Sequence, residues 1–140
     1  MKTAVVYFSL GGSTRSYARA EADARQAALF EVRPAQKYNP ITAFVRGCPA
    51  ARAQKSVPLI GPLPNLSEYD RVVLMAPVWA GFPAPPFNSM VELLPRGTTV
   101  EILLVSSSGD SSACADKVRE QIQNAGCTLA AQRDIRVMRR

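Results

Sequence analysis

The sequence predicts one α/β domain built on a doubly wound parallel sheet, and three observations lead to that prediction. Runs of β-branched and aliphatic residues over 3–9, 71–76 and 98–106 have the composition of buried strands. Helix-like segments separate these runs, which is typical of parallel βαβ units. A length of 140 residues fits a single domain over 1–140 and is far too short for an eight-stranded α/β barrel.

The other elements follow from local composition. We expect helices over 13–28, 87–94 and 113–125, and shorter strands over 29–33 and 127–132.

Residues 34–67 are the least regular part of the chain, because six prolines lie among them. Two short helices are expected there, over 42–45 and 50–55. Proline cannot donate to a sheet ladder, so 57–66 is expected to be a connector without a strand.

Composition excludes several classes of function. With 47% hydrophobic residues the chain can bury a core, but no apolar run is long enough for a membrane span, and the N-terminus does not resemble a signal peptide. The chain has no histidine and three widely spaced cysteines, so neither zinc sites nor His-dependent catalytic triads are expected. Free thiols are typical of a cytoplasmic protein.

The net charge of +6 indicates a basic surface. Its simplest consequence is solubility, and the alternative is a surface that faces a partner. Aromatic residues do not interleave with the basic ones, so nucleic-acid binding is not predicted. Cys127 and Arg133 have the C-x5-R spacing of a phosphatase loop, but the segment lacks glycine and does not follow a strand, so a phosphatase is not predicted either.

Three loops follow the three buried strands, at residues 9–14, 77–86 and 106–112. The carboxyl ends of parallel strands meet at one edge of the sheet, where such folds bind ligands. We therefore expect the three loops to form one binding site. The first loop consists of Ser9, Leu10, Gly11, Gly12, Ser13 and Thr14.

The first loop precedes a helix, so its backbone N–H groups and the helix dipole suit a phosphate. Neither G-x-x-x-x-G-K-[ST] nor G-x-G-x-x-G occurs in the chain, which favours a monophosphate over a nucleoside triphosphate or a dinucleotide. The alternative is that this turn only caps the helix.

The second loop holds Trp79, the one tryptophan of the chain, close to Gly81. A loop aromatic suits stacking on a flat ligand, and glycine lets the backbone approach a ring closely. The alternative is that Trp79 packs into the core at the end of the sheet. The third loop offers donors to a polar ring edge, while Asp110 or Ser111 can equally cap the following helix.

Two motifs carry a resemblance to a known family. V-V-Y-F-S-L-G-G-S-T-R resembles the phosphate loop of flavodoxins, and A-P-V-W-A-G-F-P-A-P-P-F resembles the flavin-ring loop of a bacterial flavodoxin subgroup. Y-D-R-V-V-L resembles the strand that leads into it. The resemblance covers residues 1 to about 126. It implies a flavodoxin-like, doubly wound parallel five-stranded sheet in the order 2-1-3-4-5, with flavin mononucleotide (FMN) at the carboxyl ends of the strands.

The resemblance also implies roles for single residues. The phosphate would be held in the first loop by Ser9, Gly11, Gly12, Ser13 and Thr14. The isoalloxazine ring would be flanked by Pro77, Val78, Trp79, Ala80 and Gly81, with Trp79 stacking on it. The pyrimidine edge of the ring would be contacted by Ser107, Ser108, Gly109 and Asp110.

The chain departs from the family in three places. Gly11 stands where Ser or Thr is usual and Ser13 where Asn is common, which removes one hydroxyl contact to the phosphate. Phe82 stands where Arg is frequent. The chain ends at Arg140, with too few residues for the family's last helix. We therefore expect an apolar sheet face that is covered by a second copy in a homodimer or by part of residues 34–67.

Electron transfer through bound FMN is the predicted function, and no side chain is needed as an acid, a base or a metal ligand. The expected partner is a redox protein or a small-molecule electron acceptor. Two alternatives stay open. One is a small FMN-dependent NAD(P)H or quinone-type reductase, which the positive charge favours because carriers of this family are typically acidic. The other is a flavodoxin-like fold that has lost FMN and acts as a binding module.

Overall fold

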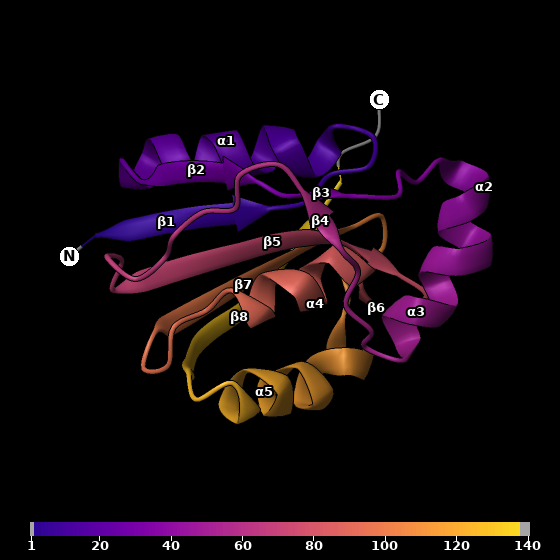
Figure 1. Ribbon diagram of the computed structural model, residues 1–140. Coiled ribbons are helices and arrows are strands. Elements are labelled where there is room, and N and C mark those ends of the chain that lie inside the picture. Colours follow the sequence, from indigo (N-terminus) through magenta and orange to yellow (C-terminus); the bar gives the residue numbers. More distant parts are fainter. Residues whose placement is uncertain (1, 138–140) are drawn as a thin grey trace.

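A mostly parallel sheet with helices on both faces makes up the protein (Figure 1). The computed structural model describes residues 2–137. The strands are β1 Thr3–Tyr7, β2 Ala28–Glu31, β3 Arg33–Pro34, β4 Leu59–Ile60, β5 Arg71–Trp79, β6 Phe82–Pro83, β7 Thr99–Ser106 and β8 Thr128–Arg136. The helices and helical turns are α1 Ser13–Arg25, α2 Pro40–Thr42, the π-turn η1 Ala43–Gly47, α3 Cys48–Arg52, α4 Pro85–Glu92, the 3₁₀ turn η2 Ser112–Cys114 and α5 Ala115–Asn124.

The five main strands lie in the order β2-β1-β5-β7-β8, and each pair of neighbours is parallel. Counted along the chain, this is the order 2-1-3-4-5, so the predicted flavodoxin-like topology is confirmed. The central strands β1, β5 and β7 are almost continuously buried, as expected for parallel strands covered on both faces.

The two faces of the sheet are covered differently (Figure 1). On one face α1 packs its small residues Ala18 and Ala22 against Val5 and Leu103. On the other face α4 and α5 enclose the larger core, in which Phe87 is fully buried. Among the described residues no helix has the length and apolar character that crossing a membrane requires.

The expectation of an uncovered apolar sheet face is wrong. On the α1 side of β7, Leu103 and Val105 are each only 2% exposed. Glu101, which shares that face, accepts hydrogen bonds from Arg25 at 2.8 Å and Arg71 at 2.7 Å. Charged groups therefore cover the area where an apolar surface was expected, and the reason for predicting a second copy at this face disappears.

Residues 34–67 do not cover this face either. They run along the opposite side of the sheet, beside α4 and α5. The Val57 N–H donates to Ser89 Oγ at 2.8 Å, and Gln54 Nε2 donates to Gln121 Oε1 at 3.1 Å. The prediction that this segment replaces the missing helix is therefore also wrong.

The irregular segment is more ordered than expected. The two helices predicted over 42–45 and 50–55 form one continuous helical stretch over 40–52. Pro49 has no N–H to donate to the carbonyl four residues earlier, and the helix widens into the π-turn η1 just before it. The stretch 57–66, expected to lack a strand, contains β4, which pairs antiparallel with β3.

Several other boundaries differ from the prediction by a few residues, as for β2 and α4, and three of the differences are larger or bear on the site. Helix α1 ends at Arg25 instead of reaching residue 28, and β8 runs on to Arg136 instead of ending at 132. Strand β5 continues to Trp79, so the first residues of the predicted second loop belong to the sheet. Proline is tolerated there because the ladder between β5 and β1 ends at Met75, so the N–H that Pro77 lacks would have no partner on that side.

Candidate functional site

The carboxyl ends of β1, β5 and β7 surround a cavity of about 250 Å³. This cavity brings together nine of the predicted site residues: Ser9, Leu10, Gly11, Ser13, Thr14, Pro77, Val78, Trp79 and Ser107. All three predicted loops contribute to its lining, as the convergence of parallel strands requires.

Other predicted residues do not line the cavity. These are Gly12, Ala80, Gly81, Ser108, Gly109 and Asp110. Conversely, sequence reasoning missed Val105 and Val137, and it placed Ser106 in the third loop without giving it a contact to the ligand. Val105 lies near the end of β7, so its position at a strand end was a usable signal. Val137 follows β8, whose length was underestimated.

The first loop leads into a helix N-terminus without a side-chain cap. Ser9 Oγ accepts a hydrogen bond from the Gly12 N–H at 2.9 Å, which fixes the turn. No side chain caps α1, and its first turn contains no acidic residue. The first N–H groups of a helix have no partner within the helix, so a group that accepts hydrogen bonds can be bound there. The alternative, in which a side chain of this turn caps the helix, does not agree with the structure, because no such hydrogen bond is formed.

Trp79 both packs into the core and lines the cavity. Its ring meets Tyr38 edge to face at a centroid distance of 5.0 Å and Phe8 at 5.8 Å. The backbone of Gly47 lies against the same ring. The indole is therefore held in place by aromatic and backbone contacts from three separate segments.

A tight hairpin turn joins β5 to β6 just beyond Trp79. Ala80 and Gly81 both have left-handed backbone angles, with φ of 53° and 86°. Positive φ at both central residues defines a type I′ turn, the usual connection of a two-residue hairpin. The role of Gly81 is thus to close the hairpin that positions Trp79.

The third loop bonds mostly to itself. The Gly109 N–H donates to Ser106 Oγ at 2.9 Å. The Asp110 carboxylate accepts the Ser112 N–H at 2.9 Å, and this hydrogen bond holds the pKa of Asp110 below its usual range. Asp110 therefore stabilises the start of η2, the capping role that was the alternative for it.

A second cavity of about 430 Å³ lies on the β2 side of the first loop and shares Ser9 and Leu10 with the first cavity. Its wall includes Arg15, whose guanidinium donates to Glu31 at 2.7 Å. Burial alone would raise the pKa of Glu31, but Arg15 and then Arg33 hold it below its usual range. Sequence reasoning missed this cavity because one of its walls includes Ile60 of β4, a strand that the sequence did not predict.

Comparison with known proteins identifies the family. The family model described as Flavodoxin matches residues 2–132. The chain belongs to the flavodoxin family. No curated protein sequence matches it at a significant level.

Several solved structures share the flavodoxin fold of this chain. A flavoprotein from Lactobacillus acidophilus NCFM, solved in complex with FMN, is 18% identical with a TM-score of 0.80, over 95% of this chain and 92% of that one. A protein from Bacteroides eggerthii DSM 20697 has a TM-score of 0.81 at 20% identity, over 98% and 89%. Two-electron reduced Megasphaera elsdenii flavodoxin has a TM-score of 0.56 at 18% identity, over 97% and 87%. At these identities the comparison establishes the fold.

Proposed function

We propose that this flavodoxin binds FMN in the 250 Å³ cavity and transfers electrons through it. The observation that carries the proposal is the meeting of an uncapped helix N-terminus and a half-buried indole in one cavity. A phosphate needs the first of these groups and a flat ring needs the second. The FMN complex of the Lactobacillus acidophilus flavoprotein, which shares the fold, supports the same ligand.

The described residues fit FMN in a specific way. The N–H groups of the loop between Ser9 and Thr14 would hold the phosphate, and Trp79 would pack on the ring. The fixed positions of Trp79 and of the first loop reduce the ordering cost of binding. The flavin supplies the redox chemistry when bound, and the protein binds it, orients it and limits its exposure to water. Free Cys48, Cys114 and Cys127 are consistent with a cytoplasmic location, which is part of the proposal.

One observation favours a second candidate, a small FMN-dependent NAD(P)H or quinone-type reductase. The 430 Å³ cavity beside the first loop has space for a small acceptor, and its wall carries Arg15, Arg33 and Lys37. Tyr38 lines this cavity and contacts Trp79, which lines the other one. Stopped-flow reduction of the FMN-loaded protein by NAD(P)H distinguishes the reductase, which is reduced rapidly, from a carrier, which is not.

The proposal is tested by incubating the purified protein with FMN, removing free flavin and recording the visible spectrum. Flavin absorption that stays with the protein, together with quenched flavin fluorescence, supports the proposal. Trp79 is the one tryptophan, so quenching of its emission locates the flavin at this cavity. The variant Trp79→Phe keeps an aromatic ring and should bind FMN somewhat more weakly than the wild type. Trp79→Ala should bind FMN with an affinity lower by about tenfold or more. A colourless protein that leaves FMN fluorescence unchanged would instead favour a binding module without flavin.

A further inference from the structure

The helical stretch over 40–52 has its large and small side chains on unexpected sides. Its buried side carries Ala43, Gly47 and Ala51. Its outer side carries Ile41, Phe44 and Val45, which are 74%, 76% and 63% exposed. The spacing i, i+3, i+4 places these three on one face of the helix. A surface helix normally points such residues into the core, so this outward apolar face needs an explanation.

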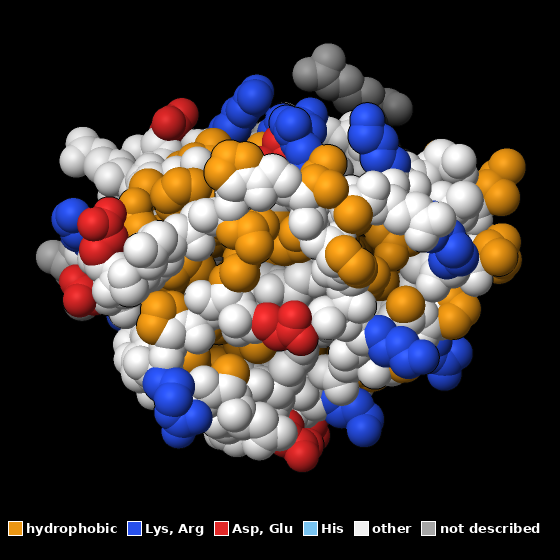
Figure 2. Space-filling model, in the orientation of Figure 1, with side chains coloured by type: hydrophobic (Ala, Val, Ile, Leu, Met, Phe, Trp, Pro, Cys, Tyr) orange, Lys and Arg blue, Asp and Glu red, His pale blue; other side chains and the backbone are white. Residues whose placement is uncertain are grey.

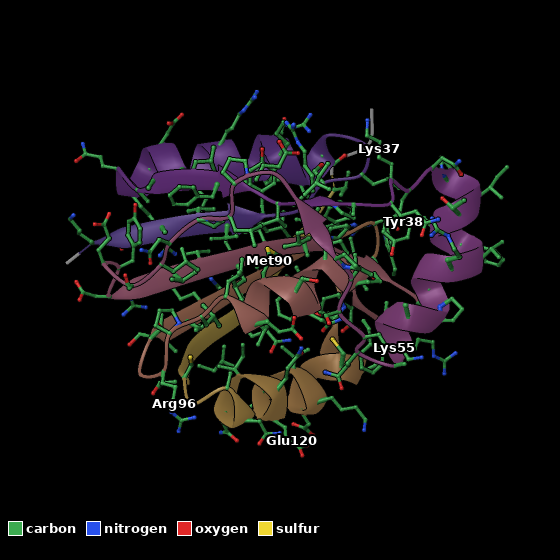
Figure 3. All side chains as sticks on the ribbon, viewed as in Figure 1. Lys37, Tyr38, Lys55, Met90, Arg96 and Glu120 are labelled. Carbon is green, nitrogen blue, oxygen red and sulfur yellow. The ribbon has the colours of Figure 1, made fainter. Side chains whose placement is uncertain are left out.

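The charged residues of the segment that carries this face are all basic. Between residues 32 and 67 the chain contains no Asp or Glu. The basic residues of this stretch are Arg33, Lys37, Arg46, Arg52 and Lys55. In Figure 2 the apolar side chains at the right-hand edge lie among blue side chains, with no red ones beside them. Lys37 precedes the helical stretch and Lys55 follows it (Figure 3).

The same helix lies over the proposed flavin site. Gly47 packs against the Trp79 ring, and Arg46 lies 5.2 Å from the centre of the Tyr38 ring, which itself contacts Trp79. One helix thickness therefore separates the exposed apolar side chains from the indole that would stack on FMN. Anything bound to the outer face is held close to the flavin.

We propose that this docking surface, formed by Lys37, Ile41, Phe44, Val45, Arg46 and Arg52, binds an acidic electron-transfer protein. The inference rests on the proposed function and names its partner class. An apolar centre with a charged rim is the usual anatomy of a protein interface, and a purely basic rim selects a partner of opposite charge. Three apolar side chains make a small patch, which suits the weak, short-lived complexes of redox proteins.

Other occupants fit the observations less well. A second copy of the chain would bring a like-charged surface to the same place, and like charges oppose each other across an interface. A membrane surface would satisfy the charge but offers no electron acceptor next to Trp79. In the proposed complex the reduced flavin loses one electron and the oxidised centre of the partner gains it, and no bond is formed or broken.

The test uses two haem proteins of opposite charge as probes: cytochrome b5, which is acidic, and cytochrome c, which is basic. The FMN-loaded protein is reduced with dithionite and mixed with each ferric protein in a stopped-flow instrument over a range of salt concentrations. Haem reduction of cytochrome b5 should slow as salt is added, because screening weakens attraction between opposite charges, whereas that of cytochrome c should become faster. A cytochrome b5 rate that rises with salt, or does not depend on it, overturns the proposal.

Variants localise the effect. Phe44→Ser and the double variant Lys37→Glu with Arg52→Glu should each lower the rate constant with cytochrome b5 about tenfold at low salt. The matched controls are Leu29→Ser, an exposed apolar site on β2, and the double variant Arg19→Glu with Arg119→Glu on α1 and α5. Equal rates for surface variants and controls overturn the proposal.

A binding measurement separates this inference from flavin binding. The ¹⁵N-labelled, FMN-free protein is titrated with ferrous cytochrome b5, and its backbone amide signals are followed by NMR. Shifts concentrated over residues 37–52 support the surface even if FMN does not bind. Shifts on another face overturn it. Two other results also overturn it. If the protein sediments with vesicles of phosphatidylglycerol and phosphatidylcholine and Phe44→Ser abolishes this, the surface binds a membrane. If the protein is a dimer that Phe44→Ser dissociates, the surface binds a second copy.

Discussion

Gly47 lies so close to Trp79 that a Cβ atom on residue 47 would come within 2.5 Å of Trp79 Cζ3 and 2.7 Å of Cε3. Real side chains do not tolerate such distances, so either the ring or the helix would have to move. The contact joins the helix of the docking surface to the cavity wall. Glycine at this position is therefore required by the close approach of backbone to ring.

Gly47→Ala is expected to lower the free energy of unfolding by about 1–3 kcal/mol, because the methyl group overpacks a filled contact. It should also weaken FMN binding, since the indole is displaced. Urea unfolding of the FMN-free protein, followed by Trp79 fluorescence, measures the first effect. Gly11→Ala is the control, because a Cβ there meets no atom within 4 Å. Equal unfolding midpoints for the two variants would contradict the predicted overpacking.

The sequence was sufficient to predict the parallel strands and the meeting of three loops, because buried parallel strands leave a strong local pattern and their carboxyl ends share one edge. The order of the strands came from the resemblance to flavodoxins and not from any local pattern. It was not sufficient to locate Trp79 against Gly47, because that contact joins segments far apart in the chain. Pro77 suggested a loop by local rules, yet it continues β5 because the neighbouring strand β1 already stops pairing at Met75.

The charge network on the α1 face shows a second limit of sequence reasoning. A missing helix implied an exposed apolar surface, but one residue on this face, Glu101, is charged and gathers basic side chains over it. Glu101 accepts from Arg25 and Arg71 and lies 3.7 Å from Arg133. These cations come from α1, β5 and β8, and no local pattern links them. The register of the sheet brings Arg71 and Arg133 to this carboxylate, and the packing of α1 on the sheet adds Arg25.

Glu101→Gln is expected to destabilise the protein by about 3 kcal/mol near neutral pH, because it leaves partly buried cations without their counter-charge. The hydrogen bond from Arg25 and then that from Arg71 lower the pKa of Glu101 from 4.5 to about 2. A lowered pKa stabilises the fold above pH 4.5, and this contribution is lost as the pH falls towards 2. Wild type and variant should therefore converge in stability over that range.

Urea unfolding at a series of pH values checks the prediction. Glu92→Gln, a substitution at an exposed position on α4, is the control and should follow the wild-type curve throughout. A difference between wild type and Glu101→Gln that stays constant from pH 7 to the acid limit would assign the effect to packing instead of charge.

Ser9→Ala is expected to weaken binding of FMN but not of riboflavin. The Ser9 hydroxyl holds the Gly12 N–H at 2.9 Å and so fixes the turn before α1. Riboflavin lacks the phosphate, so loss of this turn should weaken the binding of FMN alone. The dissociation constant of FMN should rise about fivefold, as expected for one hydrogen bond. Titrations followed by flavin fluorescence give both dissociation constants. The control Ser16→Ala changes an exposed hydroxyl in α1, and an equal loss for both ligands would argue that Ser9 does not act through the phosphate.

Ala80→Asn is expected to stabilise the protein, because Ala80 occupies a left-handed conformation with φ of 53°. This conformation costs an alanine about 1 kcal/mol, whereas Asn-Gly is the preferred pair in a type I′ turn. The gain should appear as a higher Tm in thermal unfolding. The same substitution at Ala24, on the exposed side of α1, should lower the Tm, because asparagine is a poorer helix former than alanine. If the same substitution raises the Tm at residue 80 and lowers it at residue 24, the effect depends on backbone conformation. A fall in Tm for both variants would show that the turn between β5 and β6 is not of type I′.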